Sequence, residues 1–507
     1  STFRSSVVVN KSAENAKSAV SFDKELSENN IVTIQPDSLR ILHNPLTGWV
    51  LYASMGVDAA DFWAQYDHMY IPELGHNVSV TDYAHTLYIR ASWTDFNPQE
   101  DVYGWKIDSN LRAYIEGAYQ RNMRLAFRVV VDSRDKRTEF TPQFVKDAGA
   151  KGFMNKGKWS PYSDDPVFQK YYTKFVKALA KDFNDPSKVE FIDGFGLGKW
   201  GEYHTMIYST GDDTPKKAVF DWVTDIYSQA FDKVPVVINY HRWIGAGKDW
   251  VDDEHFAADS EEMLEGAIKK GYSLRHDAFG MTTYYGSWER RFAKKYRNIC
   301  PIIMEGGWIV KSHSYWQDPR GYRKDSHEDV RRGEFDDSKE AHVNMMDFRF
   351  GDTESWFKDA FDLVRRFLRE GGYRLYPSEI SLPLEVSKKT TPTIKHCWNN
   401  LGWGYCPTNI PQWNQKYKVA FALLDSETNE ARYTFVDTDT DLSKWIKGSP
   451  VEYVFEPDMS KVETGTYVWA VGLVDRGNKD LVGLDIAAKG DILDSGWLKL
   501  SKVSINK

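Results

Sequence analysis

Two glutamates follow strand-like stretches of this chain, and both have tryptophan and glycine as close neighbours. Glu202 comes after the glycine-rich run 195–201, and Glu305 comes directly after the apolar run 301–304. Cleavage of a glycosidic bond requires two carboxylates that face the bond, one to protonate the leaving oxygen and one to attack the sugar or activate water. The sequence therefore predicts that Glu202 and Glu305 form such a pair. The alternative for each is an ordinary loop carboxylate, since the chain has 73 Asp and Glu residues.

The elements that must bring this pair together alternate in type along the chain. Strand-like runs cover residues 48–53, 85–90, 124–131, 189–197, 234–240, 276–282, 301–304 and 342–346. Helical periodicity covers residues 110–120, 165–183, 216–231, 260–270, 288–296 and 355–370. Eight strands with intervening helices predict a (β/α)8 TIM barrel. The alternative is an open doubly wound sheet, although no glycine-rich phosphate loop follows any of the strands.

The alternation of strands and helices ends after residue 376. Short β-rich runs separated by turn residues cover 418–424, 430–436, 451–455, 466–474 and 496–503. They predict a C-terminal antiparallel β-sandwich. The expected organisation is a polar N-terminal arm at 1–35, a catalytic barrel at 36–375 and a β-sandwich domain at 376–507.

In a barrel of this kind, functional side chains stand at the carboxyl ends of the strands. Glu202 follows the fourth expected strand and Glu305 the seventh, and these two strands lie nearly opposite each other across the barrel. The two side chains are therefore expected to converge. A carboxyl separation of about 5–5.5 Å would give retention through a covalent intermediate.

This arrangement resembles the large clan of (β/α)8 retaining glycosidases that includes β-galactosidases, β-mannanases and cellulases. Residues 91–105, with Trp93, Pro98 and Trp105, are similar to the segment after the second strand of barrel β-galactosidases. The opening run 44–49, together with the C-terminal sandwich, resembles secreted bacterial proteins of polysaccharide degradation. The resemblance implies that Glu202 is the acid/base and Glu305 the nucleophile of a glycoside hydrolase with no cofactor or metal.

One position departs from the pattern of that clan. Most of its members have Asn directly before the acid/base, where it holds the sugar 2-hydroxyl, and this chain has Gly201. Asn239, at the end of the fifth expected strand, is a candidate for that contact.

Further polar and aromatic residues follow the expected strands. The predicted substrate-binding residues are Arg90, Trp93, Arg128, Trp200, His204, Asn239, His241, Tyr284, Tyr285, Trp308 and Trp316. Arg90, Arg128 and Arg134 favour an anionic glycan, sulfated or uronate and of galactan type, because guanidinium binds such groups with two parallel hydrogen bonds. The alternative is that these arginines pair with the catalytic carboxylates. His276 and Asp277 are expected to begin the sixth strand and to have a structural role.

Composition narrows the class of protein. The 507 residues carry a net charge of −8, which gives no support to nucleic-acid binding. No apolar run reaches the length of a transmembrane helix, about 18 residues. The 15% aromatic content, with 19 Trp, suits sugar rings that stack on aromatic faces. Three Cys form no disulfide framework, although Cys397 and Cys406 could pair across a hairpin.

The chain begins at Ser1 with no signal peptide, which is typical of a mature or trimmed form. Together with the resemblance, the polar first segment leads us to expect a secreted, periplasmic or surface-tethered bacterial protein. Two other functions remain open. One is a carbohydrate-binding protein on a barrel scaffold without a working carboxylate pair, and the other is a lyase that uses Tyr and His for proton transfer.

Overall fold

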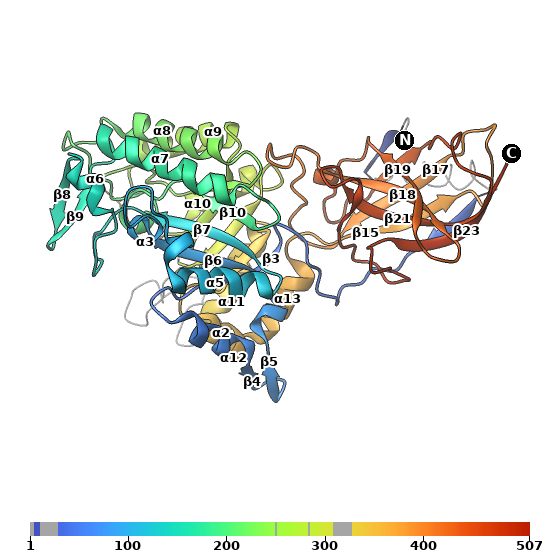
Figure 1. The fold of residues 1–507 in the computed structure, drawn as a ribbon, viewed down its shortest axis with the longest axis horizontal. Coiled ribbons are helices and arrows are strands. Elements are labelled where there is room, and N and C mark those ends of the chain that lie inside the picture. Colours follow the sequence, from blue (N-terminus) through green and yellow to red (C-terminus); the bar gives the residue numbers. More distant parts are fainter. Residues whose placement is uncertain (1–4, 11–28, 249–250, 282–283, 308–326) are drawn as a thin grey trace. The chain divides into compact units, whose positions relative to one another are not determined.

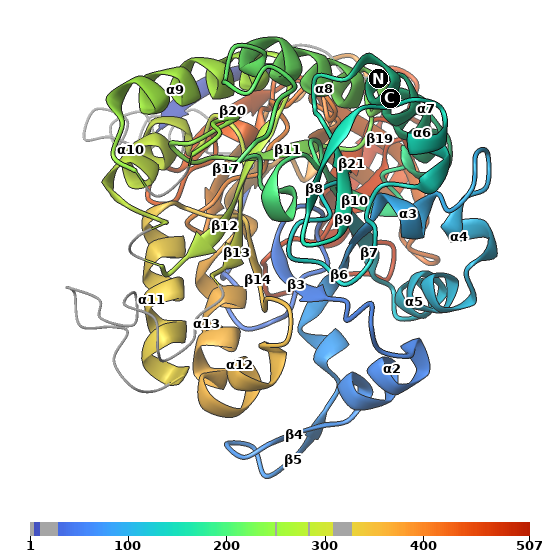
Figure 2. The ribbon, with the colours of Figure 1, turned by 90° about the vertical axis from the view of Figure 1, so that its left-hand side faces the viewer.

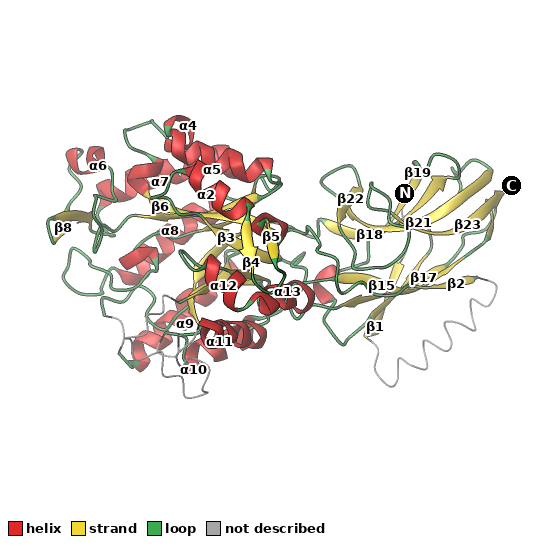
Figure 3. Cartoon of the chain, turned by 90° about the horizontal axis from the view of Figure 1, so that it is seen from below, coloured by secondary structure: helices red, strands yellow, loops and turns green. Residues whose placement is uncertain are grey.

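The computed structural model describes residues 5–10, 29–248, 251–281, 284–307 and 327–507. The chain divides into two compact units. One contains residues 48–367 and 410–412, and the other contains residues 1–47, 368–409 and 413–507. Figure 3 shows that helices cluster in the first unit and that strands dominate the second.

The first unit is a closed barrel of eight parallel strands, which confirms the predicted fold. Around the barrel the strands follow in chain order: β3 (Gly48–Tyr52), β6 (Ala84–Ser92), β7 (Arg124–Val130), β10 (Val189–Asp193), β11 (Val236–Asn239), β12 (Ser273–Phe279), β13 (Ile302–Gly306) and β14 (Met345–Asp347). Figure 2 shows these strands in the middle of the unit, surrounded by helices.

The helices of this unit are mostly those that the periodicity predicts. They are α2 (Ala59–Asp67), α3 (Trp93–Phe96), α4 (Gly104–Ile107), α5 (Ser109–Gln120), α6 (Gln143–Asp147), α7 (Pro166–Phe183), α8 (Lys216–Ala230), α9 (Glu254–Lys269), α10 (Ser287–Tyr296), α11 (His327–Glu340), α12 (Thr353–Asp359) and α13 (Phe361–Glu370). The expected single helix 355–370 is two helices. Five further helices, α2, α3, α4, α6 and α11, were not predicted, and the last of these has a polar sequence without an apolar stripe. Two hairpins decorate the barrel: β4 (Met69–Ile71) with β5 (His76–Val78), and β8 (Gly152–Asn155) with β9 (Lys158–Pro161).

Helix α7 illustrates how local sequence produces these elements. The Asp165 side chain accepts a hydrogen bond from the Phe168 N–H, and Pro166 occupies the first turn, where its missing N–H costs nothing. Phe168, Tyr172 and Phe175 then recur on one buried face.

The sixth strand begins three residues earlier than the pattern suggested, at Ser273 instead of His276. His276 and Asp277 therefore lie near its carboxyl end, where functional groups gather, and the expectation of a purely structural role for them is wrong.

The second unit contains two sheets, as the prediction of an antiparallel β-sandwich requires. The first sheet has the order β1 (Ser5–Asn10), β20 (Val451–Phe455), β17 (Ile394–Asn400), β15 (Leu375–Leu382) and β2 (Asn30–Thr33). The second has the order β16 (Glu385–Ser387), β23 (Leu498–Asn506), β21 (Gly465–Asp475), β18 (Tyr417–Asp425) and β19 (Ala431–Asp437), with β22 (Leu481–Leu484) beside β21. Phe421 of one sheet stacks on Phe455 of the other and contacts His396, so the sheets share a core.

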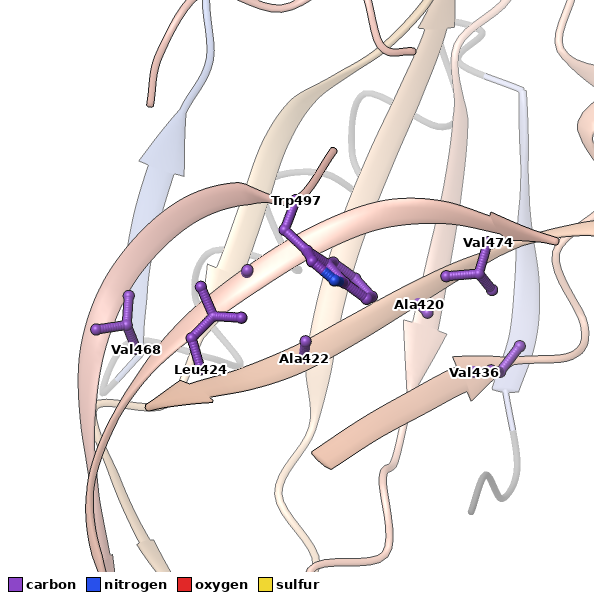
Figure 4. Packing of buried hydrophobic residues seen from close by; sticks show 8 residues of the cluster. Ala420, Ala422, Leu424, Val436, Val468, Val474 and Trp497 are labelled. Carbon is purple, nitrogen blue, oxygen red and sulfur yellow. The ribbon is translucent and has the colours of Figure 1, made fainter. Parts of the chain in front are cut away.

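A second apolar cluster covers the other face of the six-stranded sheet. It contains Ala420, Ala422, Leu424, Val436, Val468, Ala470, Val474 and Trp497. In Figure 4 the Trp497 ring extends over the small side chains that β18 presents on this face. Alternating positions along β18 supply the cluster, as the two-residue period of a strand requires.

Two expectations about this unit need correction. Residues 1–35 are not only an arm, because β1 pairs with β20 and β2 pairs with β15. Residues 1–47 therefore group with the C-terminal sheets, and the barrel unit begins at residue 48. Cys397 and Cys406 are buried and do not form a disulfide. No helix among the described residues is both long enough and apolar enough to cross a membrane.

Candidate active site

A pocket of about 830 Å³ lies in the barrel unit, lined mainly by residues at the carboxyl ends of its strands and in the loops that follow. Of the residues singled out in the sequence, the pocket lining contains Arg90, Trp200, Glu202, His204, Asn239, His241, Tyr284 and Glu305. These come from the ends of β6, β11 and β13 and from the loops after β10, β11 and β12.

Other candidates lie elsewhere. Trp93 is fully buried and packs against Tyr172 and Phe168 in the helical layer, so it does not face the pocket. The Tyr285 hydroxyl is hydrogen-bonded to Tyr240 and its ring stacks on Phe279, outside the lining. The last two candidates, Trp308 and Trp316, lie outside the described residues.

Arg128 connects the two glutamates from below the pocket. Its Nη2 donates to Glu305 Oε2 at 2.9 Å, and its Nη1 lies 3.8 Å from Glu202 Oε2. The side chain has no exposed surface. The sequence-based expectation that Arg128 binds substrate is therefore wrong: it holds the two carboxylates on neighbouring nitrogens of one guanidinium.

A second buried arginine completes the support of Glu305. Arg275 Nη1 donates to Glu305 Oε2 at 2.8 Å and to Asp277 Oδ1 at 3.0 Å, and its Nη2 donates to Asp347 Oδ2 at 3.2 Å. Glu305 thus accepts charge-assisted hydrogen bonds from two guanidinium groups.

The two arginines share three acidic partners, Asp193, Asp277 and Glu305, and each has one more of its own. Arg128 Nε donates to Asp193 Oδ2 at 3.0 Å, and Arg128 Nη2 donates to Asp277 Oδ2 at 2.6 Å. Five carboxyl groups, Glu202 and Asp347 included, against two guanidinium groups leave an excess of negative charge if all are ionised. Burial, followed by the charge of Glu305, raises the pKa of Asp347 well above its usual range. A protonated Asp347 relieves part of this excess.

Glu202 lies in a loop whose backbone is strained. Gly198 and Gly201 have positive φ, and so do the non-glycine residues Trp200, Tyr203 and Thr205, at 60°, 63° and 53°. Such conformations cost free energy and persist where the surroundings fix them. Here Arg90 Nη2 donates to the Trp200 carbonyl at 2.9 Å.

Two histidines contact Glu202 directly. His204 Nε2 lies 3.0 Å from Glu202 Oε1, and its Nδ1 lies 2.9 Å from Thr205 Oγ1. His241 Nδ1 accepts from the Trp243 N–H, so its Nε2 carries the proton and donates to the Glu202 carbonyl at 2.7 Å.

The charge state of Glu202 follows from these contacts. Burial opposes ionisation, but the hydrogen bond from His204 and the charges of His204, Arg128 and Arg90 together lower the pKa of Glu202 below its usual range. In the resting site Glu202 is therefore a carboxylate hydrogen-bonded to His204.

Asn239 has an unused acceptor in the pocket. Its Nδ2 donates to Asp277 Oδ2 at 3.2 Å, whereas its buried Oδ1 has no hydrogen-bond partner within the described residues. A sugar hydroxyl is a suitable donor for this oxygen.

Gly201 has a structural explanation. Its φ is +73°, and a Cβ at this position would lie 3.2 Å from Val130 Cγ2 and 3.3 Å from Arg128 Cδ. A side chain at this position would therefore be in tight contact with the bridging arginine, so the Asn found here in the clan that the sequence resembles would require a neighbour to shift.

We predict that Gly201→Ala destabilises the protein by about 1–2 kcal/mol, because it combines left-handed strain with a tight contact. Gly211→Ala is the matched control, since Gly211 has a φ of +76° but open space around it. Denaturant unfolding of both variants measures the difference. Equal destabilisation would mean that contact with Arg128 and Val130 does not constrain position 201.

Several residues of the site escaped the sequence analysis. Tyr52 and Lys136 line the pocket, and Asp193, Arg275 and Asp347 lie beneath it. Asp193 and Asp347 are the last residues of β10 and β14, so their position at strand ends was the available signal. Arg134, in contrast, is engaged by Asp132 at 2.6 Å and does not line the pocket.

Comparison with known proteins gives structural likenesses only. The chain matches no family model, and the comparison with curated proteins gives no match. Endoglycoceramidase II from Rhodococcus sp. is similar at 13% identity, over 84% of this chain and 99% of that chain, with a TM-score of 0.39. A GH30 endoxylanase from Clostridium papyrosolvens is similar at 9% identity, over 84% and 100%, with a TM-score of 0.38. An endoglucanase from Pseudomonas stutzeri is similar at 10% identity, over 66% and 97%, with a TM-score of 0.39. Structural likeness at these scores does not indicate the activity of this chain.

Proposed function

We propose that this protein is a retaining glycoside hydrolase that acts on a polysaccharide or on oligosaccharides derived from it. The observation that carries the proposal is the bridge of Glu202 and Glu305 by one buried guanidinium at the wall of a large pocket. The bridge sets an upper limit of roughly 9 Å on the distance between the two carboxylate oxygens that contact Arg128, which admits both the separation of about 5–5.5 Å of retaining enzymes and that of about 6.5–9.5 Å of inverting enzymes. Retention is therefore proposed from the resemblance noted in the sequence, and the configuration of the product tests it.

In the first step, a Glu305 carboxylate oxygen attacks the anomeric carbon while the bond from that carbon to the leaving oxygen breaks. The leaving oxygen takes a proton from Glu202. In the second step, Glu202 accepts a proton from water, and the water oxygen displaces Glu305 from the sugar. Two displacements at one carbon restore its original configuration.

The proton for the first step has a defined source. Because Glu202 is ionised in the resting site, we propose that Glu202 and His204 hold one proton between them across their 3.0 Å contact. The proton lies on His204 at rest. It moves to Glu202 as the leaving oxygen approaches, and Thr205 Oγ1 accepts from the opposite ring nitrogen throughout.

The pocket suits a sugar substrate in size and lining. Its volume lies within the usual range for ligand sites, about 300–1,000 Å³. Tyr52, Trp200 and Tyr284 supply aromatic surface for the apolar faces of sugar rings. We also propose a secreted, periplasmic or surface-tethered bacterial location, where a polysaccharide substrate is met.

One observation favours a second candidate function. The lowered pKa of Glu202 is unusual for a general acid and fits a carbohydrate-binding protein on a barrel scaffold. Such a protein binds glycans without cleaving them, so turnover separates the two functions.

The test is a screen of neutral, sulfated and uronate polysaccharides with the wild-type protein, Glu202→Ala and Glu305→Ala. We expect reducing ends from the wild type alone, and the first product seen by proton NMR should keep the anomeric configuration of the substrate. Inversion would exclude the covalent intermediate. Binding of a glycan without any cleavage would support the second candidate.

Glu202→Ala should show a dependence on the leaving group. For an aryl glycoside with a dinitrophenol leaving group, which departs without a proton, we expect kcat/KM close to wild type and a reduced kcat. For an unactivated glycoside, kcat/KM should fall by roughly 10²–10⁴-fold, the usual contribution of general acid catalysis. An equal loss on both substrates would mean that Glu202 does not protonate the leaving oxygen.

A further inference from the structure

Two cations of the pocket lining form no ion pair with any acidic residue that the structure describes. Arg90, at the end of β6, and Lys136, in the loop after β7, both line the pocket. Within the described part of the chain, neither forms an ion pair within 4.0 Å. Arg90 makes two hydrogen bonds, to the Trp200 carbonyl at 2.9 Å and to the Tyr52 hydroxyl at 3.4 Å. Since guanidinium has five N–H donors, several remain for a ligand.

The neighbouring cations are already neutralised. Arg134 pairs with Asp132 at 2.6 Å, and Lys199 pairs with Asp135 at 3.2 Å. Arg349, which lines the pocket from the loop after β14, lies 3.7 Å from Asp352. Arg90 and Lys136 therefore differ from the other cations near the pocket.

Lys136 is half-buried, and its ammonium group lies 5.3 Å from the centre of the Phe140 ring. Burial, followed by the charge of Arg90, lowers the pKa of Lys136 to about 8. Two cations that repel each other in a partly desolvated pocket are stabilised by an anion bound between them.

We propose that Arg90 and Lys136 form a subsite for a negatively charged substituent of the sugar, either the carboxylate of a uronic acid or a sulfate ester. The proposal rests on the proposed function, because it assigns the substrate class of the same pocket. A carboxylate or sulfate accepts parallel hydrogen bonds from the Arg90 guanidinium and a charge-assisted hydrogen bond from Lys136. The two arginines below the pocket, Arg128 and Arg275, take no part, because carboxyl groups of the protein occupy them.

Acidic residues also line this pocket, and they define the competing explanation. Asp95 and Glu202 are part of the lining, and the charges of Glu202 and Asp135 act on Lys136 from the loops after β10 and β7. In this alternative, the charge of Lys136 only affects the ionisation of Glu202, and Lys136 does not contact the substrate. The two roles differ in which ligands respond to the loss of Lys136.

The experiment compares charged and neutral sugars on the full chain. Saturation-transfer NMR titrations at constant ionic strength use glucuronate, galacturonate and galactose 6-sulfate against glucose and galactose. For the wild type we expect at least one charged sugar to bind more tightly than its neutral counterpart. The uronate and sulfate arms identify which anion the subsite takes.

Variants then assign the effect to Lys136. Lys136→Met should weaken binding of the charged sugar by roughly 10- to 100-fold, the usual contribution of a hydrogen bond to a charged group, and Lys136→Arg should restore most of it. Lys156→Met is the matched control, because Lys156, in the turn between β8 and β9, is exposed and pairs with Asp135. We expect no change in that variant, and thermal unfolding verifies that all three variants are folded.

The titration should also depend on pH. The Lys136 ammonium group is present below pH 8 and is lost above it, so binding of the charged sugar should weaken between about pH 7 and pH 9. The groups that face Lys136 are Arg90, Arg128, Glu202 and Asp135. The two arginines stay charged through this range. The two acids are ionised throughout it, since their pKa values are lowered.

The outcomes separate this proposal from the glycosidase proposal. Equal binding of charged and neutral sugars, no binding of any charged sugar, or an equal loss on all sugars in Lys136→Met would each overturn the anion subsite. Preferential binding of a charged sugar together with a failure to cleave any glycoside would retain the subsite and remove the glycosidase. Cleavage of neutral glycosides by a protein that does not prefer charged sugars would support the glycosidase and exclude the anion subsite.

Discussion

Replacing Glu305 with alanine is expected to lower kcat on an aryl glycoside by roughly 10⁴–10⁶-fold, the scale of losses seen when a catalytic nucleophile is removed. The reason is that Glu305 lines the pocket, accepts hydrogen bonds from Arg128 and Arg275, and shares Arg128 with Glu202. Asp277 also lines the pocket and accepts from both arginines, but a third donor, Asn239, holds it as well. Without Glu305, no covalent intermediate forms. The measurement is release of the aryl group under single-turnover conditions.

A nucleophile supplied from solution distinguishes a missing nucleophile from a damaged site. Azide should restore part of the aryl release in Glu305→Ala, because it fits the space that the carboxylate leaves. The product should be a glycosyl azide of inverted configuration, since only one displacement occurs. The matched control is Glu190→Gln on β10, a buried carboxylate that pairs with Arg124 at 3.2 Å outside the pocket lining. If Glu305→Ala kept a rate within tenfold of Glu190→Gln, Glu305 would not be the nucleophile.

The alternation of strands and helices is what made the barrel predictable from sequence. The buried strands are mostly continuous apolar runs, as in β3 and β13, and α7 has both a capping residue and an apolar stripe. Glu305 stood out because an apolar strand ends on it. These signals are local in the chain, so a single sequence contains them.

The polar interior of the barrel was not predictable in the same way. Strand β12 contains Arg275, His276 and Asp277, a run that does not resemble a buried strand, and the predicted strand began only after Arg275, three residues late. Arg275 and Asp277 are tolerated inside the barrel because partners from β7, β13 and β14 neutralise them. Partners that are far apart in the chain leave no local pattern. The same holds for Lys136, which differs from nearby cations because no acidic residue in the described part of the chain pairs with it.

Removal of Arg128 should have the largest effect on stability. The Arg128→Met variant keeps most of the volume of the side chain but leaves Asp193, Asp277 and Glu305 with one guanidinium in place of two. Breaking a fully buried ion pair by removing one partner costs about 3–5 kcal/mol, because the remaining charge is uncompensated. We expect a loss of this size in the free energy of unfolding, measured by urea denaturation at pH 7.

The same strand provides the control. Arg124 lies on β7 with Arg128, but its side chain is 30% exposed and it pairs with Glu190. Arg124→Met leaves one buried carboxyl group, Glu190, without its cation instead of three, and should therefore cost less, about 1–3 kcal/mol. If Arg128→Met lowered the free energy of unfolding no more than Arg124→Met, the buried ion pairs of Arg128 would not stabilise the fold as proposed.

The Arg128 variant also tests how the two carboxylates are coupled. Because Arg128 lowers the pKa of Glu202, its removal should raise that pKa and shift the proton from His204 toward Glu202 at rest. At the same time Glu305 loses one of its two guanidinium donors and with it part of its orientation. We therefore expect kcat/KM to fall on activated and unactivated glycosides alike, in contrast to Glu202→Ala, where the loss depends on the leaving group. A leaving-group-dependent loss in Arg128→Met would mean that Arg128 serves Glu202 alone and that the nucleophile is held by Arg275.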